Sequence, residues 1–125
     1  MFIPSALYYT ENHLWLRPVG LYDYFIGITD FAQKEIGGIN LIELELENNK
    51  MKKEMVWGNI YGLNQTFDLI APLECKVMAT NITLDKRASS INSDPYTHWF
   101  VRVSVEMTIS PSAFLNSEEY IKLIQ

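Results

Sequence analysis

The chain has 125 residues, a length that suits one compact domain with its own hydrophobic core. Its formal charge is −5, from 15 acidic and 10 basic residues, and the basic residues occur only in small groups. This pattern argues against the concentrated basic face that nucleic-acid binding requires. We therefore expect a single domain over residues 1–125 that does not bind nucleic acid.

The cysteine and the N-terminus indicate a cellular setting. Cys75 is the single cysteine and lies among apolar residues, so we expect a buried thiol, no internal disulfide and a reducing cytoplasm. Residues 1–15 are apolar but lack a basic leader and a small-residue cleavage pattern. No segment has the apolar length that a bilayer crossing requires, so the sequence predicts a soluble, non-exported protein without a membrane anchor.

Short strands dominate the predicted elements. Residues 14–17 and 22–28 flank a turn that contains proline and glycine, which predicts two antiparallel strands. In residues 42–47 aliphatic side chains alternate with glutamates, and in residues 101–105 valines alternate with polar side chains. Alternation with a period of two is typical of strands that bury one face.

A hairpin is predicted in the middle of the chain. Met55–Tyr61 and Thr66–Ile70 have strand-like composition, and residues 62–65 join them. Residues 85–96 are polar and rich in turn formers, so we expect a surface connection there.

Two helices are expected, over residues 31–36 and 117–124. Each is preceded by a residue that favours the N-cap, and Gly37-Gly38 follows the first as a stop signal. The predicted pairs of N-cap and capping-box partner are Asp30 with Gln33 and Asn116 with Glu119.

No catalytic constellation is visible. His13 and His98 are the only histidines, and neither has a cysteine or histidine at the spacing of a metal site. The sequence also lacks a glycine-rich phosphate loop. The residues alone therefore predict a non-catalytic binding or carrier module with no metal.

Several stretches, in order along residues 8–124, resemble the H protein of the glycine cleavage system. They are YTENHLWLR (9–17), GITDFAQKEIG (27–37), the proline of IAPLECKV (70–77), INSDPY (91–96), the Trp99–Val103 strand and NSEEYIKLI (116–124). The resemblance implies a mainly β barrel-sandwich hybrid of the lipoyl type, with a short internal helix and a C-terminal helix. It also implies a carrier without catalytic activity of its own.

In that family a lysine at an exposed hairpin tip carries lipoate through an amide bond. The resemblance implies that this arm receives an aminomethyl group from the decarboxylase and presents it to the aminomethyltransferase and the lipoamide reductase. A tethered arm keeps the intermediate at high effective concentration near these partners.

The position of the family's lysine is taken by asparagine. The motif E-S-V-K corresponds here to Tyr61, Gly62, Leu63 and Asn64. Asn64 lies 34 residues after Asp30 and 30 before Asp94, and both spacings resemble those between the lysine and the matching residues in the family. A carboxamide nitrogen is not nucleophilic, since its lone pair is delocalised, so Asn64 cannot be lipoylated. We therefore expect no cofactor.

The sequence also offers alternatives to this assignment. Lys76 follows Glu74-Cys75 in a shortened version of the motif, but it falls inside the next predicted strand, which disfavours lipoylation there. Asn64 and Gly62 are also ordinary turn residues, because both tolerate left-handed backbone conformations.

The cleft that shelters the loaded arm in the family is also altered. The family motif H-E-W reads His13-Leu14-Trp15 here, which removes an acid from the cleft, whereas Asp68 matches an acid that follows the lysine. Cys75 replaces the glycine of a turn, where glycine allows a positive φ.

Two functions stay open. The first is a glycine cleavage H-like module that is not lipoylated and acts as an accessory or regulatory binding protein. The second is a participant in glycine cleavage or lipoate handling that docks the partner enzymes. Both need a protein partner, and the sequence leaves open its identity, a ligand in the cleft and the oligomeric state.

Overall fold

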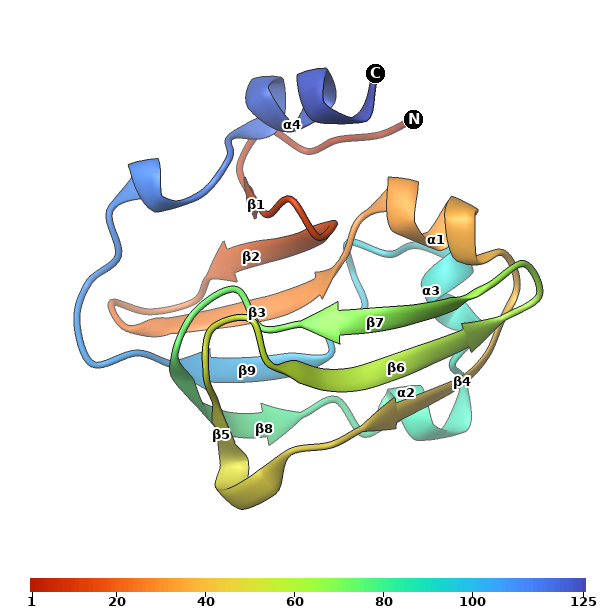
Figure 1. The fold of residues 1–125 in the computed structure, drawn as a ribbon, viewed down its shortest axis with the longest axis horizontal. Helices are drawn as coiled ribbons and strands as arrows, with labels where there is room; N and C mark the ends of the chain where they lie inside the picture. The colour runs from red at the N-terminus through yellow and green to blue at the C-terminus, as the bar shows by residue number, and fades with distance from the viewer.

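The computed structural model describes the backbone of residues 1–125 and every side chain except those of Asp85 and Lys86. Its strands form two antiparallel sheets that face each other (Figure 1). The six-stranded sheet has the order β1 (Tyr8–Tyr9), β2 (Leu14–Pro18), β3 (Asp23–Ile28), β9 (Val101–Ser104), β8 (Cys75–Thr80) and β5 (Lys50–Met51). The three-stranded sheet has the order β4 (Ile39–Leu44), β6 (Val56–Gly62) and β7 (Thr66–Ile70).

The main core lies between these sheets. Leu14 and Ile26 come from the larger sheet and Trp57 and Ile60 from the smaller one, and all four are fully buried. The predicted alternation is confirmed in residues 101–105, where the three valines are buried and the polar residues between them are not. The alternation therefore identified the inner face of each sheet.

The strand predicted over residues 42–47 is correct in its pattern but displaced along the chain, because β4 begins three residues earlier, at Ile39. Ile42 and Leu44 are half-buried against the core and the glutamates point outward. β4 ends at Leu44, because the 3-10 turn η1 (Glu47–Asn49) follows, with Asn48 and Asn49 at positive φ.

Helix α1 (Asp30–Ile36) forms as expected, but its predicted N-cap is wrong. Thr29 is the N-cap, and its Oγ1 accepts a hydrogen bond from the Ala32 N–H at 3.2 Å. Asp30 instead occupies the first turn, where its carboxylate accepts a hydrogen bond from Gln33. The negative charge of this carboxylate also interacts favourably with the positive N-terminal end of the helix dipole. The glycine stop is confirmed, because Gly37 is the C-cap with a φ of 80°.

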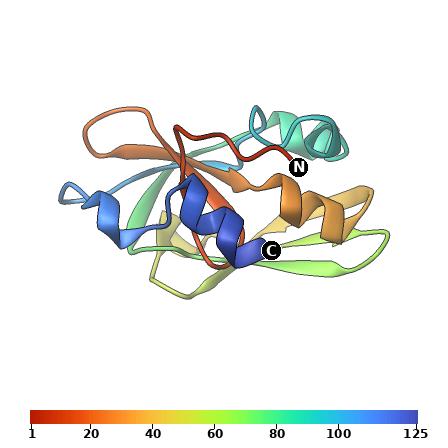
Figure 2. The same ribbon diagram turned by 90° about the horizontal axis from the view of Figure 1, so that it is seen from above.

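Helix α4 (Ser117–Ile124) has the predicted cap. The Asn116 side chain accepts from the Glu119 N–H at 2.9 Å, and the Glu119 carboxylate accepts from the Asn116 N–H at 3.0 Å. α4 lies across the N-terminal segment (Figure 2), where the ring of Tyr120 stacks on Tyr9 with centroids 4.8 Å apart.

Residues 85–96 are not the simple surface connection that was predicted. They include the end of α2 (Thr83–Lys86) and all of α3 (Ser90–Ser93), and a second 3-10 turn, η2 (Pro111–Ala113), precedes α4. Leu84 and Ile91 are buried, so each one-turn helix is attached to the core by one apolar side chain. The polar composition of this part of the sequence gave no indication that these two side chains are buried.

The helices are short. α4, the longest, has 8 residues, against the roughly 20 apolar residues that a membrane-spanning helix needs.

Candidate functional site

The tip of the β6–β7 hairpin is fixed against the C-terminal end of α1 (Figure 1). The Leu63 N–H donates to the Gly38 carbonyl at 3.0 Å, and the Asn64 N–H donates to the Ile36 carbonyl at 3.0 Å. The second bond satisfies the carbonyl of Ile36, one of those that a helix end leaves without partners. The position of the tip is therefore set by its backbone and not by its side chains.

Two glycines permit this close approach. A Cβ on Gly62 would overlap Cγ2 of Ile36 and lie 2.5 Å from the Ile36 carbonyl oxygen, and a Cβ on Gly37 would lie 2.8 Å from Nδ2 of Asn64. Neither Gly62 nor Asn64 has a positive φ. The hairpin tip therefore does not use the left-handed conformation that both residues tolerate, and Gly62 is required for space.

The side chains at the tip face solvent. Asn64 is exposed and lies against the backbone of Gly37, and Leu63 is 78% exposed. At this point the chain presents an apolar side chain beside a neutral amide. The glycine pair after α1 was interpreted from sequence only as a helix stop, and its contact with the tip was missed.

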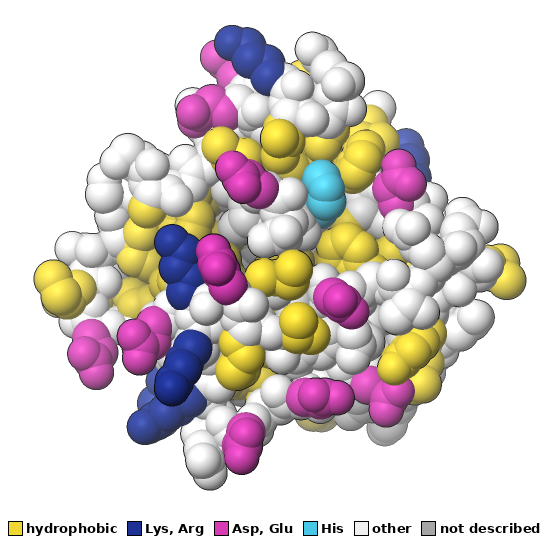
Figure 3. Space-filling view, in the orientation of Figure 1, with side chains coloured by type: hydrophobic (Ala, Val, Ile, Leu, Met, Phe, Trp, Pro, Cys, Tyr) yellow, Lys and Arg dark blue, Asp and Glu magenta, His cyan; other side chains and the backbone are white. Residues whose placement is uncertain are grey.

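An acidic surface extends from the tip along the outer face of the β4–β6–β7 sheet. Glu43 and Asp68 lie on either side of Asn59, whose amide donates to Asp68 at 2.6 Å. Two residues closer to the tip along β6, Tyr61 donates a hydrogen bond to Glu43, and this bond raises the pKa of the Tyr61 phenol. Figure 3 shows acidic side chains across this face. We call Glu43, Glu45, Tyr61 and Asp68 the acidic face.

His13 and Leu14 are placed apart from this surface. Leu14 is fully buried in β2, opposite Ile28, so its side chain does not reach a surface cleft. His13 has a φ of 67°, and its Nδ1 lies 2.8 Å from the hydroxyl of Tyr120. Burial lowers the pKa of His13, and nearby Glu35 partly offsets this effect. His13 thus contacts α4, whereas Asp68 lies on the hairpin.

Cys75 and Lys76 lie at the start of β8, far along the chain from the tip. Cys75 is buried as predicted, and burial, followed by the nearby Glu74 charge, raises the pKa of its thiol to about 12. Cys75 is not at a positive φ. Lys76 is exposed in the strand and pairs across the sheet with Lys50.

Two facing antiparallel sheets with a hairpin tip displayed beside a helix define a mainly β domain of the lipoyl type. The chain belongs to the glycine cleavage H-protein family, because the family model described as "Glycine cleavage H-protein" matches residues 7–125. The predicted resemblance and the mainly β fold are thereby confirmed.

Relatives and a solved structure agree with this assignment. The glycine cleavage system H protein of Chlorobium chlorochromatii is 33% identical over 99% of this chain and 98% of its own length. That of Listeria innocua is 37% identical over 98% of each chain. The crystal structure of the H protein from Mycobacterium marinum covers 96% of this chain and 97% of its own, with a TM-score of 0.83 and 23% identity, and it supports the fold.

Family membership corrects one prediction. We expected no cofactor, but the family is the lipoate-carrying H protein, so lipoate is the group that membership implies. At the tip, however, the residues do not fit an amide-linked lipoyl group, because Asn64 offers a carboxamide and Gly62 leaves no room for the serine of the family motif. No chemical step is therefore assigned to lipoate at this position.

Proposed function

We propose that residues 1–125 act as one H-protein-type domain that binds a partner enzyme through the hairpin tip and the acidic face. In this function residue 64 is a docking residue and not an attachment point for lipoate. The protein works as an accessory or regulatory module, has no catalytic activity of its own and operates in the cytoplasm. The observation that carries the proposal is the position of Asn64 and Gly62 against the end of α1.

The fixed tip supports docking. A partner that binds a preorganised surface does not have to order it first, and ordering costs about 0.5–1.5 kcal/mol per immobilised side chain. Leu63 supplies an exposed apolar side chain, and the carboxylates of the acidic face favour a partner with basic residues. Family membership favours the enzymes of glycine cleavage or of lipoate handling as that partner.

Intact-mass measurement tests the attachment part of the proposal. The protein is expressed with lipoate and a lipoate ligase, and the Listeria innocua H protein serves as the positive control. We expect a lipoyl adduct on the control and none at residue 64 of this chain. An adduct located at residue 64 by peptide mapping would overturn this part.

A variant series shows which residues set this behaviour. Asn64→Lys alone restores the amine but retains Gly62, and the quadruple variant Tyr61→Glu, Gly62→Ser, Leu63→Val and Asn64→Lys restores the family motif. We expect stronger modification of the quadruple variant, because its tip must move away from Ile36 to accommodate the serine Cβ. If both variants are lipoylated to the same extent, the position of the tip against Ile36 does not affect lipoylation.

Binding measurements test the docking part. Calorimetry with the decarboxylase, the aminomethyltransferase and the lipoamide reductase identifies the partner. Leu63→Ala and Glu43→Lys should each weaken binding by about tenfold or more, since one removes apolar contact and the other reverses a charge. Glu118→Lys, at an exposed site on α4, is the matched control and should bind like the wild type. Unchanged affinity of both tip-side variants would exclude this surface.

A further inference from the structure

A groove runs along the open edge of β4. This strand is the last one of the smaller sheet, so one of its sides pairs with β6 and the other side carries no strand. The end of β8 and α2 lie beside that open side (Figure 1). The groove has a volume of about 350 Å³, and its mostly apolar lining consists of Ile42, Leu44, Leu46, Thr80, Asn81 and Leu84.

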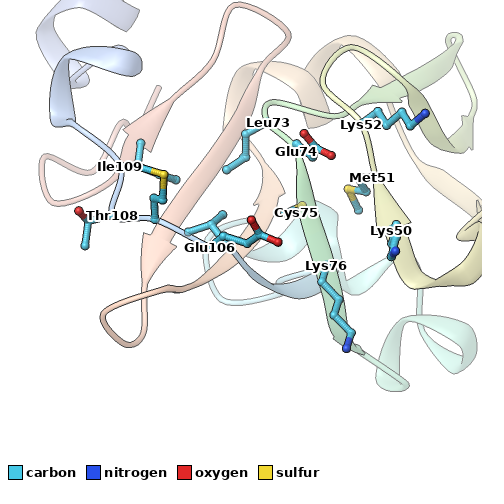
Figure 4. Close-up of a pocket in the computed structure, with 12 residues that line it drawn as sticks. Lys50, Met51, Lys52, Leu73, Glu74, Cys75, Lys76, Glu106, Thr108 and Ile109 are labelled. Atoms are coloured by element: carbon cyan, nitrogen blue, oxygen red, sulfur yellow. The ribbon is translucent and has the colours of Figure 1, made fainter.

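The larger sheet does not close this groove. Among the strand pairs of the described backbone, β5 meets β8 only at Cys75 and Lys76, as Figure 4 shows. Residues 77–80 of β8 continue beside β9 and have no ladder on their other side within that backbone. The two sheets are therefore open toward each other between β4 and the end of β8.

The backbone at the open edge belongs to residues whose side chains line the groove. The Glu45 N–H donates to the Trp57 carbonyl at 2.8 Å, and the register of β4 on β6 is regular over residues 41–44. In an antiparallel pair, residues whose backbone groups bond to the partner alternate with residues whose groups point away from it. Glu43 thus bonds to β6, whereas Ile42 and Leu44 direct their N–H and C=O groups to the open edge.

The two faces of β4 differ in character. Ile42 and Leu44 are half-buried and face the groove, whereas Glu43 and Glu45 are exposed on the acidic face. A strand that pairs with β4 places alternate side chains on these two faces, each opposite a residue of β4. One set of its side chains therefore meets apolar residues, and the other set meets carboxylates.

We propose that β4 binds an extended segment of a partner protein by strand addition, and that apolar and basic residues alternate in this segment. Main-chain hydrogen bonds to Ile42 and Leu44 supply affinity, and the alternating side chains supply specificity. The apolar side chains of the segment enter the groove beside Leu84, and its basic side chains pair with Glu43 and Glu45. This interaction goes beyond docking of the hairpin tip and does not rest on it.

An NMR titration with the peptide acetyl-Val-Lys-Val-Lys-Val-amide tests the proposal. Saturable shifts are expected at the Ile42 and Leu44 amides, and their hydrogen exchange should slow, because the peptide covers the open edge. The Glu43 and Glu45 amides already bond to β6, so their exchange should change less. The amide spectrum reports folding at the same time.

Two control peptides separate strand addition from simple attraction. The same peptide with N-methyl groups on the amides that face β4 retains the charge but loses these donors, so it should not bind. Acetyl-Val-Glu-Val-Glu-Val-amide retains the donors but carries the wrong charge, and it should also fail to bind. Binding of either control peptide as strongly as the lysine peptide would overturn the proposal, as would a lack of saturable shifts at Ile42 and Leu44.

Two variants with the same change of charge locate the site. Glu45→Lys should weaken binding of the lysine peptide by about fivefold, because it replaces an attraction with a repulsion. Glu118→Lys, at an exposed position on α4, is the matched control and should leave the affinity unchanged. Equal affinities of these two variants would also overturn the proposal. The peptide titration contains no partner enzyme and does not involve Leu63 or Asn64, so strand addition and docking of the tip can fail separately.

Discussion

The hairpin tip and the aromatic cluster beneath α4 are positioned by different interactions. At the tip, backbone hydrogen bonds to Ile36 and Gly38 set the position, and Leu63 and Asn64 point into solvent. In the aromatic cluster, which we define as Tyr9, Trp15, Tyr96 and Tyr120, side chains make the contacts and all four residues are buried.

This difference explains where the sequence can change without loss of the fold. A residue whose side chain is exposed and whose backbone makes the contact, such as Asn64, should tolerate replacement of its side chain. A residue whose side chain is the contact cannot be replaced without creating a cavity or an unpaired polar group. The predictions below test this contrast.

Trp15→Ala should have the largest effect. Trp15 is fully buried, its indole N–H donates to the Pro95 carbonyl at 3.1 Å, and its ring fills the space beside Gly27. Its removal should lower the free energy of unfolding by about 3–5 kcal/mol. Urea denaturation measures this loss, and a loss below about 1 kcal/mol would contradict the importance of the cluster.

Gly62→Ala should have the next largest effect and should act on the tip. The added Cβ overlaps the Ile36 backbone, which cannot move aside as a side chain could, so we expect a cost of about 1–3 kcal/mol. Hydrogen exchange should show faster exchange of the Leu63 and Asn64 amides in this variant.

Two controls separate backbone from side chain at the tip. Gly20→Ala introduces a Cβ whose nearest neighbour is at 3.8 Å, so stability should change little. Asn64→Ala retains the N–H that bonds to Ile36 and should change stability by less than about 0.5 kcal/mol. A large effect of Asn64→Ala would show that the side chain also holds the tip.

The sequence predicted elements from local patterns but could not predict contacts between them. Strand alternation and the Asn116 capping box depend on neighbouring residues, and both were correct. Thr29 and Asp30 are adjacent residues that both favour an N-cap, so local pattern alone could not choose between them.

The site depends on contacts that are distant in sequence. The approach of Gly62 to Ile36 joins residues on different elements, and the opposition of Lys50 and Lys76 depends on the strand register. Neither leaves a local signal. The position of Asn64 in the hairpin was predictable from the strand-like composition on either side of it, whereas its packing against α1 was not.

Tyr120→Phe should have a smaller effect, centred on α4. The Tyr120 hydroxyl lies 2.7 Å from Oγ1 of Thr29 and 2.8 Å from Nδ1 of His13. Its removal leaves these groups with fewer partners, and we expect a loss of about 1–2 kcal/mol by urea denaturation. Tyr22→Phe alters an exposed ring and is the control, with an expected change below about 0.5 kcal/mol.

The smallest effect should be a pH dependence that arises from His13. With His13 neutral, the hydrogen bonds form one consistent chain: the Ala32 N–H donates to Thr29, the Thr29 hydroxyl to Tyr120, and the Tyr120 hydroxyl to Nδ1 of His13. Protonation places a hydrogen on Nδ1 and reverses the chain, which leaves the buried Thr29 hydroxyl hydrogen without an acceptor in it. Burial, the larger cause of the lowered His13 pKa, has the same direction, and Glu35 opposes it.

The sign of the pH dependence follows from these contacts. Because the pKa of His13 is lower in the folded state, the unfolded chain binds the extra proton first as the pH falls below about 6.5. Stability should therefore decrease from pH 7 to pH 5, with a slope from this group of at most about 1.4 kcal/mol per pH unit. His13→Asn removes the titrating ring, and asparagine tolerates the positive φ at this position, so the decrease should become shallower in urea denaturation at each pH. If the slope of stability against pH is unchanged in His13→Asn, other groups cause the decrease. The series of hydrogen bonds through Tyr120 then does not depend on the charge of His13.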